Sequence, residues 1–509
     1  MGEVLAFLKE HARDPAPVLL MGDDGEKFGL WPGTHAHVWQ GRWMEEFFTA
    51  LEAESSWLWV IPPGEAAEGA AVGRVYLPTA SYDEMEEWAL PVGTAAEYVK
   101  ARHRLEERAD PALRYLRGGF WRQFLVKYPE INTMHKKMLR VSEKVWRMPP
   151  GRRRLRALDE VWQAQCNCPY WHGVFGGVYL PHIRRANFAH LIAAEALADG
   201  EARAPVVTTS ADLDADGAVE LELSSPTMVL WIDPAEGGGV VVWDWRAAGI
   251  NLVNVLSRRR EAYHQQLLDA PAADRASESA VETIHTNRVR VKEPGLDRLL
   301  SYDRYRRASF LDHLLPPDAT VDSFASGQSV ATFAGNPYSG STSRSRSQAA
   351  ASLVREASPV PGGGGGLIRL EKRFHVEDRE RRLRVGYRIT NSGAHPVRAV
   401  FCVETNWAIT DPQSPVRIDG VPQRARAKRT APSAGRVELS DYGWPGAVAL
   451  SFPTAAVWLM PLETVSNSEA GFERTFQGLT SDSTGPIILE PTGLSATAIS
   501  CELPARRRP

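Results

Sequence analysis

The segment GDDGEKFG (residues 22–29) lies near the N-terminus and directly follows the apolar run VLLM (residues 18–21). A run of this length and composition predicts a fully buried strand. Asp23 and Asp24 come where that strand would end, and Glu26 follows two residues later. Because α/β barrel enzymes place catalytic groups at the ends of their strands, these carboxylates are candidate catalytic groups. The alternative for so short an acidic run is a solvated turn.

Two further blocks follow GDDGEKFGLWPGTHAHVW (residues 22–39) along the chain, namely VYLPTASYDEMEEWALP (residues 75–91) and QAQCNCPYWHGVFGGVYLPHIRR (residues 163–185). In composition and order, the three blocks closely resemble the 4-α-glucanotransferases and α-amylases of glycoside hydrolase family 57. The resemblance implies an α+β multidomain fold. The expected fold comprises a remnant of an incomplete (β/α) barrel, then a helical region and then a large antiparallel β-sandwich.

The resemblance also implies that part of the barrel is missing. Family members carry a histidine motif and a glutamate nucleophile on barrel strands that precede the acidic segment, whereas this chain starts with one helix-like stretch, residues 3–12. A parallel strand needs neighbours that satisfy its backbone and cover its side chains. We therefore expect a C-terminal portion of a larger enzyme, whose missing N-terminal barrel segment comes from the same gene or from a partner chain.

Hydrophobic periodicity divides the chain further. Helical patterns at residues 95–108, 132–146 and 185–198 give way to alternating apolar and polar residues, as in LRVGYRIT (residues 383–390), which predict antiparallel strands. We expect a barrel remnant at residues 1–80, a helical domain that completes the active site at 81–202, and a β-sandwich at 203–509. The Ser- and Arg-rich residues 339–352 and the glycine run 362–366 are interpreted as loops.

A retaining glycosidase needs two carboxyl groups about 5–5.5 Å apart, a nucleophile and an acid/base. The resemblance assigns the acid/base role to Asp24 and substrate contacts to Asp23 and Glu26. It makes Trp31 and Trp171 the candidate sugar-stacking residues, with Tyr170 and His172 as a polar wall. The alternative for each of these four aromatic or imidazole side chains is ordinary core packing. No cofactor and no metal is expected, because Cys166, Cys168 and His172 have no further cysteine or histidine close in sequence.

One position departs from the family pattern. The glucanotransferases read C-N-D-A-Y-W-H where this chain reads C-N-C-P-Y-W-H, so that Cys168 replaces an active-site aspartate. A thiol cannot accept charge-assisted hydrogen bonds from sugar hydroxyls as a carboxylate does. The balance between transfer and hydrolysis, and the preferred donor, are therefore left open.

Composition limits the partners. A formal net charge of -3 argues against nucleic acid, and no apolar run approaches the roughly 18 residues of a membrane-spanning helix. With only 4 cysteines and no signal-peptide pattern, the expected compartment is the cytoplasm. The expected partner is an α-glucan or maltooligosaccharide substrate. A non-catalytic α-glucan-binding protein or subunit is the alternative to an enzyme.

Overall fold

The computed structural model describes residues 1–13, 18–31, 33–69, 73–76, 81, 83–172, 176–200, 206–269, 291–327, 333–345, 348–358, 367–468 and 471–504. The described chain forms two compact units, Met1–Ala80 and the remainder from Ser81 onward. Each unit is taken by itself below.

The first unit consists of short helices, and the strand predicted at residues 18–21 is wrong. Among its described residues there is no strand. Val18, Leu19, Leu20 and Met21 belong to no helix or strand, and between 46% and 81% of their surface is exposed. The physical reason is that no described residue of this unit forms a strand with which they could pair their backbone. The predicted helix at residues 3–12 is present. The helical elements of this unit are α1 (Gly2–His11), η1 (Gly25–Phe28), η2 (Ala36–Gln40), α2 (Trp43–Ala53) and α3 (Pro63–Ala67).

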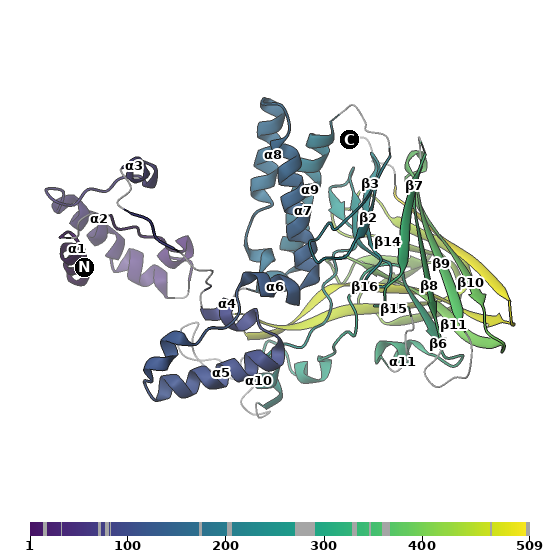
Figure 1. The fold of residues 1–509 in the computed structure, drawn as a ribbon. Helices are drawn as coiled ribbons and strands as arrows, with labels where there is room; N and C mark the ends of the chain where they lie inside the picture. Colours follow the sequence, from purple (N-terminus) through teal and green to yellow (C-terminus); the bar gives the residue numbers. More distant parts are fainter. Residues whose placement is uncertain are drawn as a thin grey trace. The chain divides into compact units, whose positions relative to one another are not determined.

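The second unit opens with helices, as predicted. The long helices α7, α8 and α9 stand side by side in Figure 1, and they pack through a common core. Helix α7 buries Ile131, Met134, Met138, Val141 and Val145, whose spacing of three and four residues forms one apolar face. The helical elements are α4 (Asp83–Trp88), α5 (Val92–Glu107), η3 (Pro111–Tyr115), α6 (Trp121–Lys127), α7 (Pro129–Trp146), α8 (Arg152–Gln163), η4 (Cys168–Tyr170), η5 (Gly177–Tyr179) and α9 (Pro181–Asp199).

A small antiparallel sheet follows the helices. In the part of the chain that the structure describes, it has the order β1-β2-β3-β4-β5. Its central strands, β3 and β4, are buried along their whole length, and Trp231, Trp243 and Trp245 supply much of that buried surface. The strands are β1 (Val207–Ala211), β2 (Glu220–Ser224), β3 (Met228–Asp233), β4 (Gly239–Trp245) and β5 (Ile250–Asn251).

A larger antiparallel sheet occupies the C-terminal half. Its main path among the described strands is β13-β12-β14-β15-β17-β10-β9-β8-β7, while β16 pairs with β15 and β11, and β6 pairs with β11. The longest strands, β15 and β16, form one extended hairpin (Figure 1). The strands are β6 (Leu311–Leu315), β7 (Ser339–Arg344), β8 (Gln348–Ala357), β9 (Ile368–Glu377), β10 (Arg382–Asn391), β11 (Val397–Trp407), β12 (Pro415–Ile418), β13 (Val421–Arg424), β14 (Arg429–Leu439), β15 (Val448–Ser468), β16 (Gly471–Leu489) and β17 (Leu494–Glu502). Short helical turns are α10 (His264–Asp269), η6 (Leu296–Leu299), α11 (Val321–Ala325) and η7 (Asp378–Glu380).

The sheet content confirms the predicted antiparallel character of this region. Strand β10 alternates buried and exposed residues as its sequence predicted. The loop expected at residues 339–352 is wrong, because β7 pairs with β8 from Ser339↔Val354 to Arg344↔Ala349. The small serine and alanine side chains of this segment are also compatible with a paired strand. Composition alone therefore could not show that the segment forms one. The glycine run at 362–366 lies outside the described residues.

Both sheets contribute to one hydrophobic core, in which Leu230 and Trp243 of the small sheet join Phe374 and Val385 of the large one. Within the described chain, no helix combines the length and the apolar character that crossing a membrane requires.

Candidate active site

The acidic segment of the first unit is a short exposed turn. Asp24 directly precedes the single-turn helix η1, and the side chains of Asp23, Asp24 and Glu26 are exposed. Asp23 Oδ1 accepts hydrogen bonds from Lys27 Nζ (2.5 Å) and from the backbone N–H of Asp24 (2.9 Å). These two bonds, the one from Lys27 first, lower the pKa of Asp23. Asp23 is thus paired with Lys27. The side chains of Asp24 and Glu26 make no hydrogen bond or ion pair with another described residue, although the charge of Asp24 also acts on Lys27.

Gly29 fixes the path of the chain after this turn. Its φ of 139° is one that residues with a side chain rarely adopt, and a Cβ there would lie 2.8 Å from Trp39 Nε1. The Trp39 indole is held in this position because its Nε1–H donates a hydrogen bond to the carbonyl of Phe28 at 2.8 Å. Gly29 therefore shapes this turn, and a residue with a side chain would not fit there. Gly25 has an ordinary φ and open space around it.

Trp31 lies half-buried on the same turn. Lys27 Nζ sits 5.3 Å from the centre of its ring, and the Trp31 backbone carbonyl accepts from Thr34 Oγ1 at 2.7 Å. The buried Trp31 Nε1 has no hydrogen-bond partner among the described residues. An indole N–H is a donor only, so this group could reach a ligand oxygen.

The aromatic block of the second unit is packed far more tightly. The Trp171 ring lies 5.1 Å from that of Trp88, and the His172 ring lies 4.7 Å from Trp88, between centres. His172 is only 2% exposed, and its Nε2 is 3.1 Å from the hydroxyl of Tyr263. Tyr170 is also buried, and its hydroxyl donates to the Ala164 carbonyl at 2.8 Å. Of the three, Trp171 has the most accessible side chain.

Trp171 and Tyr170 line an open hollow of about 310 Å³ within this unit. Its other walls come from α4, α6, α7 and the turn after α8. The lining residues are Met85, Trp121, His135, Met138, Gln165, Asn167, Tyr170 and Trp171. Aromatic walls with a few amide groups are typical of ligand sites, since the rings supply apolar contact and the amides both donate and accept hydrogen bonds.

The sequence does not single out Trp121 and His135, two side chains that line the hollow. Trp121 Nε1–H donates to the Tyr170 carbonyl at 3.2 Å, and its ring meets that of His135 edge-on with centres 4.7 Å apart. Burial first, and then the charge of Lys136, lower the pKa of His135 to about 4, so its ring is neutral near pH 7. No motif marks these positions, and both read as ordinary helix residues. By contrast, Gln165 and Asn167 lie inside the third family-like block and could have been singled out.

Glu261 is a buried carboxylate that holds the aromatic side chains around His172, namely Tyr128 and Tyr179, in place. It accepts from the Tyr179 hydroxyl at 2.6 Å and from the Tyr128 hydroxyl, and it pairs with Lys127 at 2.8 Å. Burial alone would raise its pKa, but the charge of Lys127 holds the pKa of Glu261 below its ordinary value. Because the Tyr179 ring packs against His172 at 5.2 Å, Glu261 orients the cluster without lining the hollow.

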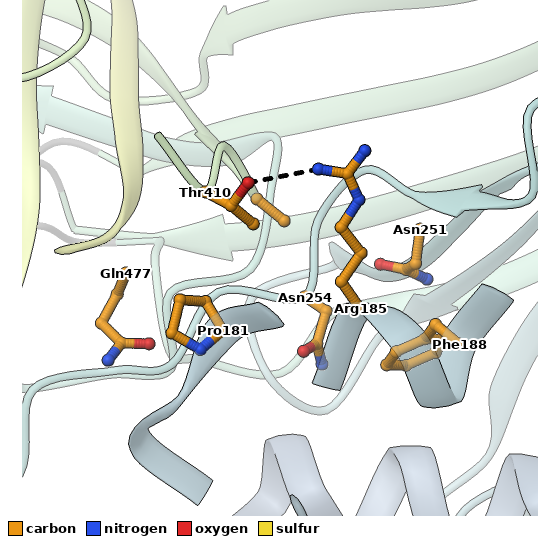
Figure 2. A pocket seen from close by; sticks show the side chains of 8 residues that line it. Pro181, Arg185, Phe188, Asn251, Asn254, Thr410 and Gln477 are labelled. Atoms are coloured by element: carbon orange, nitrogen blue, oxygen red, sulfur yellow. Dashed lines mark hydrogen bonds between the residues drawn. The ribbon is translucent and has the colours of Figure 1, made fainter. Parts of the chain in front are cut away.

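The end of the third block is anchored in the large sheet. Arg184 is buried and donates to Asn254 Oδ1 at 3.0 Å, to Gln477 Oε1 at 2.8 Å and to the Val178 carbonyl. Figure 2 shows its neighbour Arg185 reaching Thr410, with 3.2 Å between Nη1 and Oγ1. The cavity drawn there holds only about 10 Å³, room for roughly one water molecule, so it cannot be a sugar site. These arginines are structural.

Comparison with known proteins decides the family. Residues 119–198 match the sequence model described as "Alpha-amylase/4-alpha-glucanotransferase, middle domain", and residues 212–487 match the corresponding C-terminal domain. The chain belongs to the alpha-amylase/4-alpha-glucanotransferase family. An Alpha-amylase 1 from Dictyoglomus thermophilum is 34% identical over 495 residues, which cover 94% of this chain and 68% of that protein. A 4-alpha-glucanotransferase from Thermococcus litoralis is 32% identical over 478 residues, which cover 92% of this chain and 66% of that protein.

The fold agrees with this family. The crystal structure of the Thermococcus litoralis 4-alpha-glucanotransferase superposes with a TM-score of 0.74 at 29% identity, covering 98% of this chain and 70% of that one. The predicted family and the predicted enzyme class, 4-α-glucanotransferase or α-amylase, are confirmed. The alternative of a non-catalytic glycan-binding protein is not favoured, since these relatives bear enzyme names. The chain spans about two thirds of the length of the curated relatives it matches.

Proposed function

We propose that this member of the alpha-amylase/4-alpha-glucanotransferase family binds α-glucan chains in the hollow beside Trp171 and supplies the acid/base of a retaining reaction. The observation that carries the proposal is the hollow itself, because most of its walls lie within the segment that matches the family's middle domain. Indole faces stack on the apolar faces of glucose rings. The amides of Gln165 and Asn167 can exchange hydrogen bonds with sugar hydroxyls.

Roles for the acidic segment follow from its free groups. Asp24 is proposed as the general acid/base, since its side chain is exposed and binds no other described group. Glu26 and Asp23 are proposed to bind sugar hydroxyls, and Trp31 to stack on a sugar ring. In the aromatic block, Trp171 is proposed to contact sugar, while Tyr170 and His172 bind substrate or hold Trp171 in place.

Both the acidic turn and the hollow are assigned α-glucan as their ligand. We propose the division into a barrel remnant at 1–80, a helical domain at 81–202 and a sheet domain at 203–509. A nucleophilic carboxylate from a barrel segment outside these 509 residues would complete the pair that a retaining mechanism needs. The exposed apolar residues 18–21 offer a surface for such a segment.

Binding is tested with maltoheptaose and the purified chain by isothermal titration calorimetry. Trp171→Ala should weaken binding by roughly three- to tenfold, the loss expected for one aromatic stacking contact. Trp162→Ala is the matched control, because Trp162 is exposed on α8 and does not line the hollow. Equal affinity of the two variants would refute the proposed hollow.

Activity is tested by incubating the chain with maltooligosaccharides and following their length distribution. The 509 residues alone should leave the distribution unchanged, since loss of one member of a covalent-catalysis pair removes most of the rate enhancement. Robust disproportionation would show that the chain itself supplies a nucleophile. In any active assembly, Asp24→Asn should lower kcat by about 10²–10⁴-fold.

A further inference from the structure

The loop between strands β1 and β2 gathers three aspartates. Its sequence is DLDADG, residues 212–217, and carboxylate oxygens of Asp212, Asp214 and Asp216 lie within 4.8 Å of one another. Gly217 takes a φ of 95° and closes the turn. Asp212 and Asp216 are exposed, whereas Asp214 is buried. Three like charges at this spacing repel one another unless a cation lies between them.

Two buried oxygens beside this cluster lack hydrogen bonds, which an acidic surface turn does not explain. Asp214 is 4% exposed and Glu220 is 1% exposed. Asp214 Oδ1 and Glu220 Oε1 are both buried and accept no hydrogen bond from any described residue. Since buried polar atoms in folded proteins are almost always satisfied, each of these oxygens points to a ligand.

The remaining oxygens hold the loop in shape. Glu220 Oε2 accepts from the backbone N–H groups of Leu213 (2.5 Å) and Asp214 (3.3 Å), which places Glu220 against the aspartate cluster. Helix α7 fixes Asp214 from the other side. Thr133 Oγ1 donates to Asp214 Oδ2 at 3.2 Å, and Asn132 Nδ2 donates to the Asp214 carbonyl at 2.8 Å.

We propose that Asp212, Asp214 and Asp216, with Glu220 beside them, bind a calcium ion. Calcium prefers six to eight oxygen ligands, with carboxylates prominent among them, and tolerates irregular geometry. The aspartate spacing matches positions one, three and five of an EF-hand loop, with glycine at position six and Glu220 at position nine. Position twelve is Leu223, a buried strand residue, so the bidentate glutamate of an EF-hand is absent and the affinity should be modest.

The site would join two parts of the second unit. Asp214 carries the contact to Thr133 and Asn132 on α7, and the same helix carries His135 and Met138 of the hollow. Two positive charges act on Asp214: Arg306, which donates to Thr133 at 2.9 Å, and Lys136 on helix α7. Together they offset only part of the negative charge of the three aspartates and Glu220. A bound ion would therefore stabilise the seam between the small sheet and the helices.

The test uses calcium alone, titrated into the chelator-stripped chain by isothermal titration calorimetry up to about 10 mM, the range of weak calcium modules. One ion should bind per chain, and calcium should raise the Tm by a few degrees over the EGTA-treated protein. Magnesium should act more weakly, because it demands near-octahedral geometry.

The double variant Asp212→Asn/Asp216→Asn should lose at least tenfold in calcium affinity and lose the Tm shift. It changes only exposed side chains and keeps their size, so folding is preserved. Asp318→Asn, at an exposed aspartate far along the chain, should bind calcium like the unaltered protein. If the unaltered protein shows no calcium-dependent Tm shift, or the double variant retains it in full, the proposed site is wrong.

Discussion

Replacing Lys137 by methionine tests the buried charges that join helix α7 to the small sheet. Lys137 Nζ lies 2.9 Å from Asp244 Oδ2 and 3.1 Å from Glu195 Oε2, and the side chains of Lys137 and Asp244 are no more than 1% exposed. Burial alone would lower the pKa of Lys137, but the charges of Asp244 and Glu195 hold it above its ordinary value. Lys137 therefore stays charged and neutralises the carboxylates of Asp244 and Glu195.

The expected cost follows from what the variant leaves behind. Glu195 keeps Lys144 at 3.5 Å and Arg246 at 4.0 Å, so its charge stays compensated. Among the described residues, Asp244 keeps a 2.8 Å hydrogen bond from Asn251 and the more distant charge of Arg246, but no ion pair. Removing one partner of a buried ion pair costs about 3–5 kcal/mol, so Lys137→Met should lower the free energy of unfolding by that amount.

Urea denaturation followed by tryptophan fluorescence measures this loss, because the buried Trp231 and Trp243 report on the small sheet. Lys144→Met is the matched control, since Lys144 is 40% exposed and its ion pairs should contribute less than about 1 kcal/mol. The double variant Lys137→Met/Asp244→Asn should recover much of the loss. Equal stability of the two lysine variants would refute the reasoning.

The pH dependence gives a second readout. Burial raises the pKa of Asp244, and loss of the ammonium would raise it further. A carboxyl with a raised folded pKa is neutral at low pH, and its contribution to stability is lost as pH rises through that pKa. The deficit of Lys137→Met should therefore be larger at about pH 8 than at about pH 5.

Two further predictions concern the candidate site. Gly29→Ala should destabilise the acidic turn by about 1–3 kcal/mol, because the φ of Gly29 and its contact with Trp39 both exclude a Cβ. Gly25→Ala is the control and should be neutral, since the space around Gly25 is open. The rate of proteolytic cleavage within residues 18–42 measures the difference. For His135, the folded pKa of about 4 lies below the ordinary value, so its contribution to stability is present above about pH 6.5 and is lost as pH falls toward 4. Thermal unfolding of His135→Gln should vary less over that interval than the unaltered protein, and an equal slope would contradict the assignment.

The sequence predicted the parts of the fold that depend on local pattern. The amphipathic stretch at 132–146 became α7, and the alternation at 383–390 became β10. Pattern failed where pairing decides structure. Residues 18–21 have strand composition, but the described residues of their unit include no strand. Residues 339–344 have loop composition, but they pair with β8.

The candidate site divides in the same way. Motif resemblance singled out Trp171, which lines the hollow, but Trp121 and His135 reach it only because α6 and α7 pack against the following turn. The ion pairs of Lys137 join residues 58 or more positions apart along the chain. No spacing rule could have connected them.

The hydrogen bonds of Arg184 have a consequence for how this chain folds. One buried guanidinium reaches Asn254 after the small sheet and Gln477 on β16 from a helix that ends at Asp199. Burying this guanidinium without its acceptors would cost a large desolvation free energy. The helices and the sheets therefore cannot complete their packing independently. A boundary drawn near residue 200 divides the sequence but not the cooperative folding unit. Fragments produced by cutting the chain near residue 200 should therefore behave as aggregation-prone intermediates. A chimera that takes the middle domain of another family member must also take the residues that accept hydrogen bonds from this arginine.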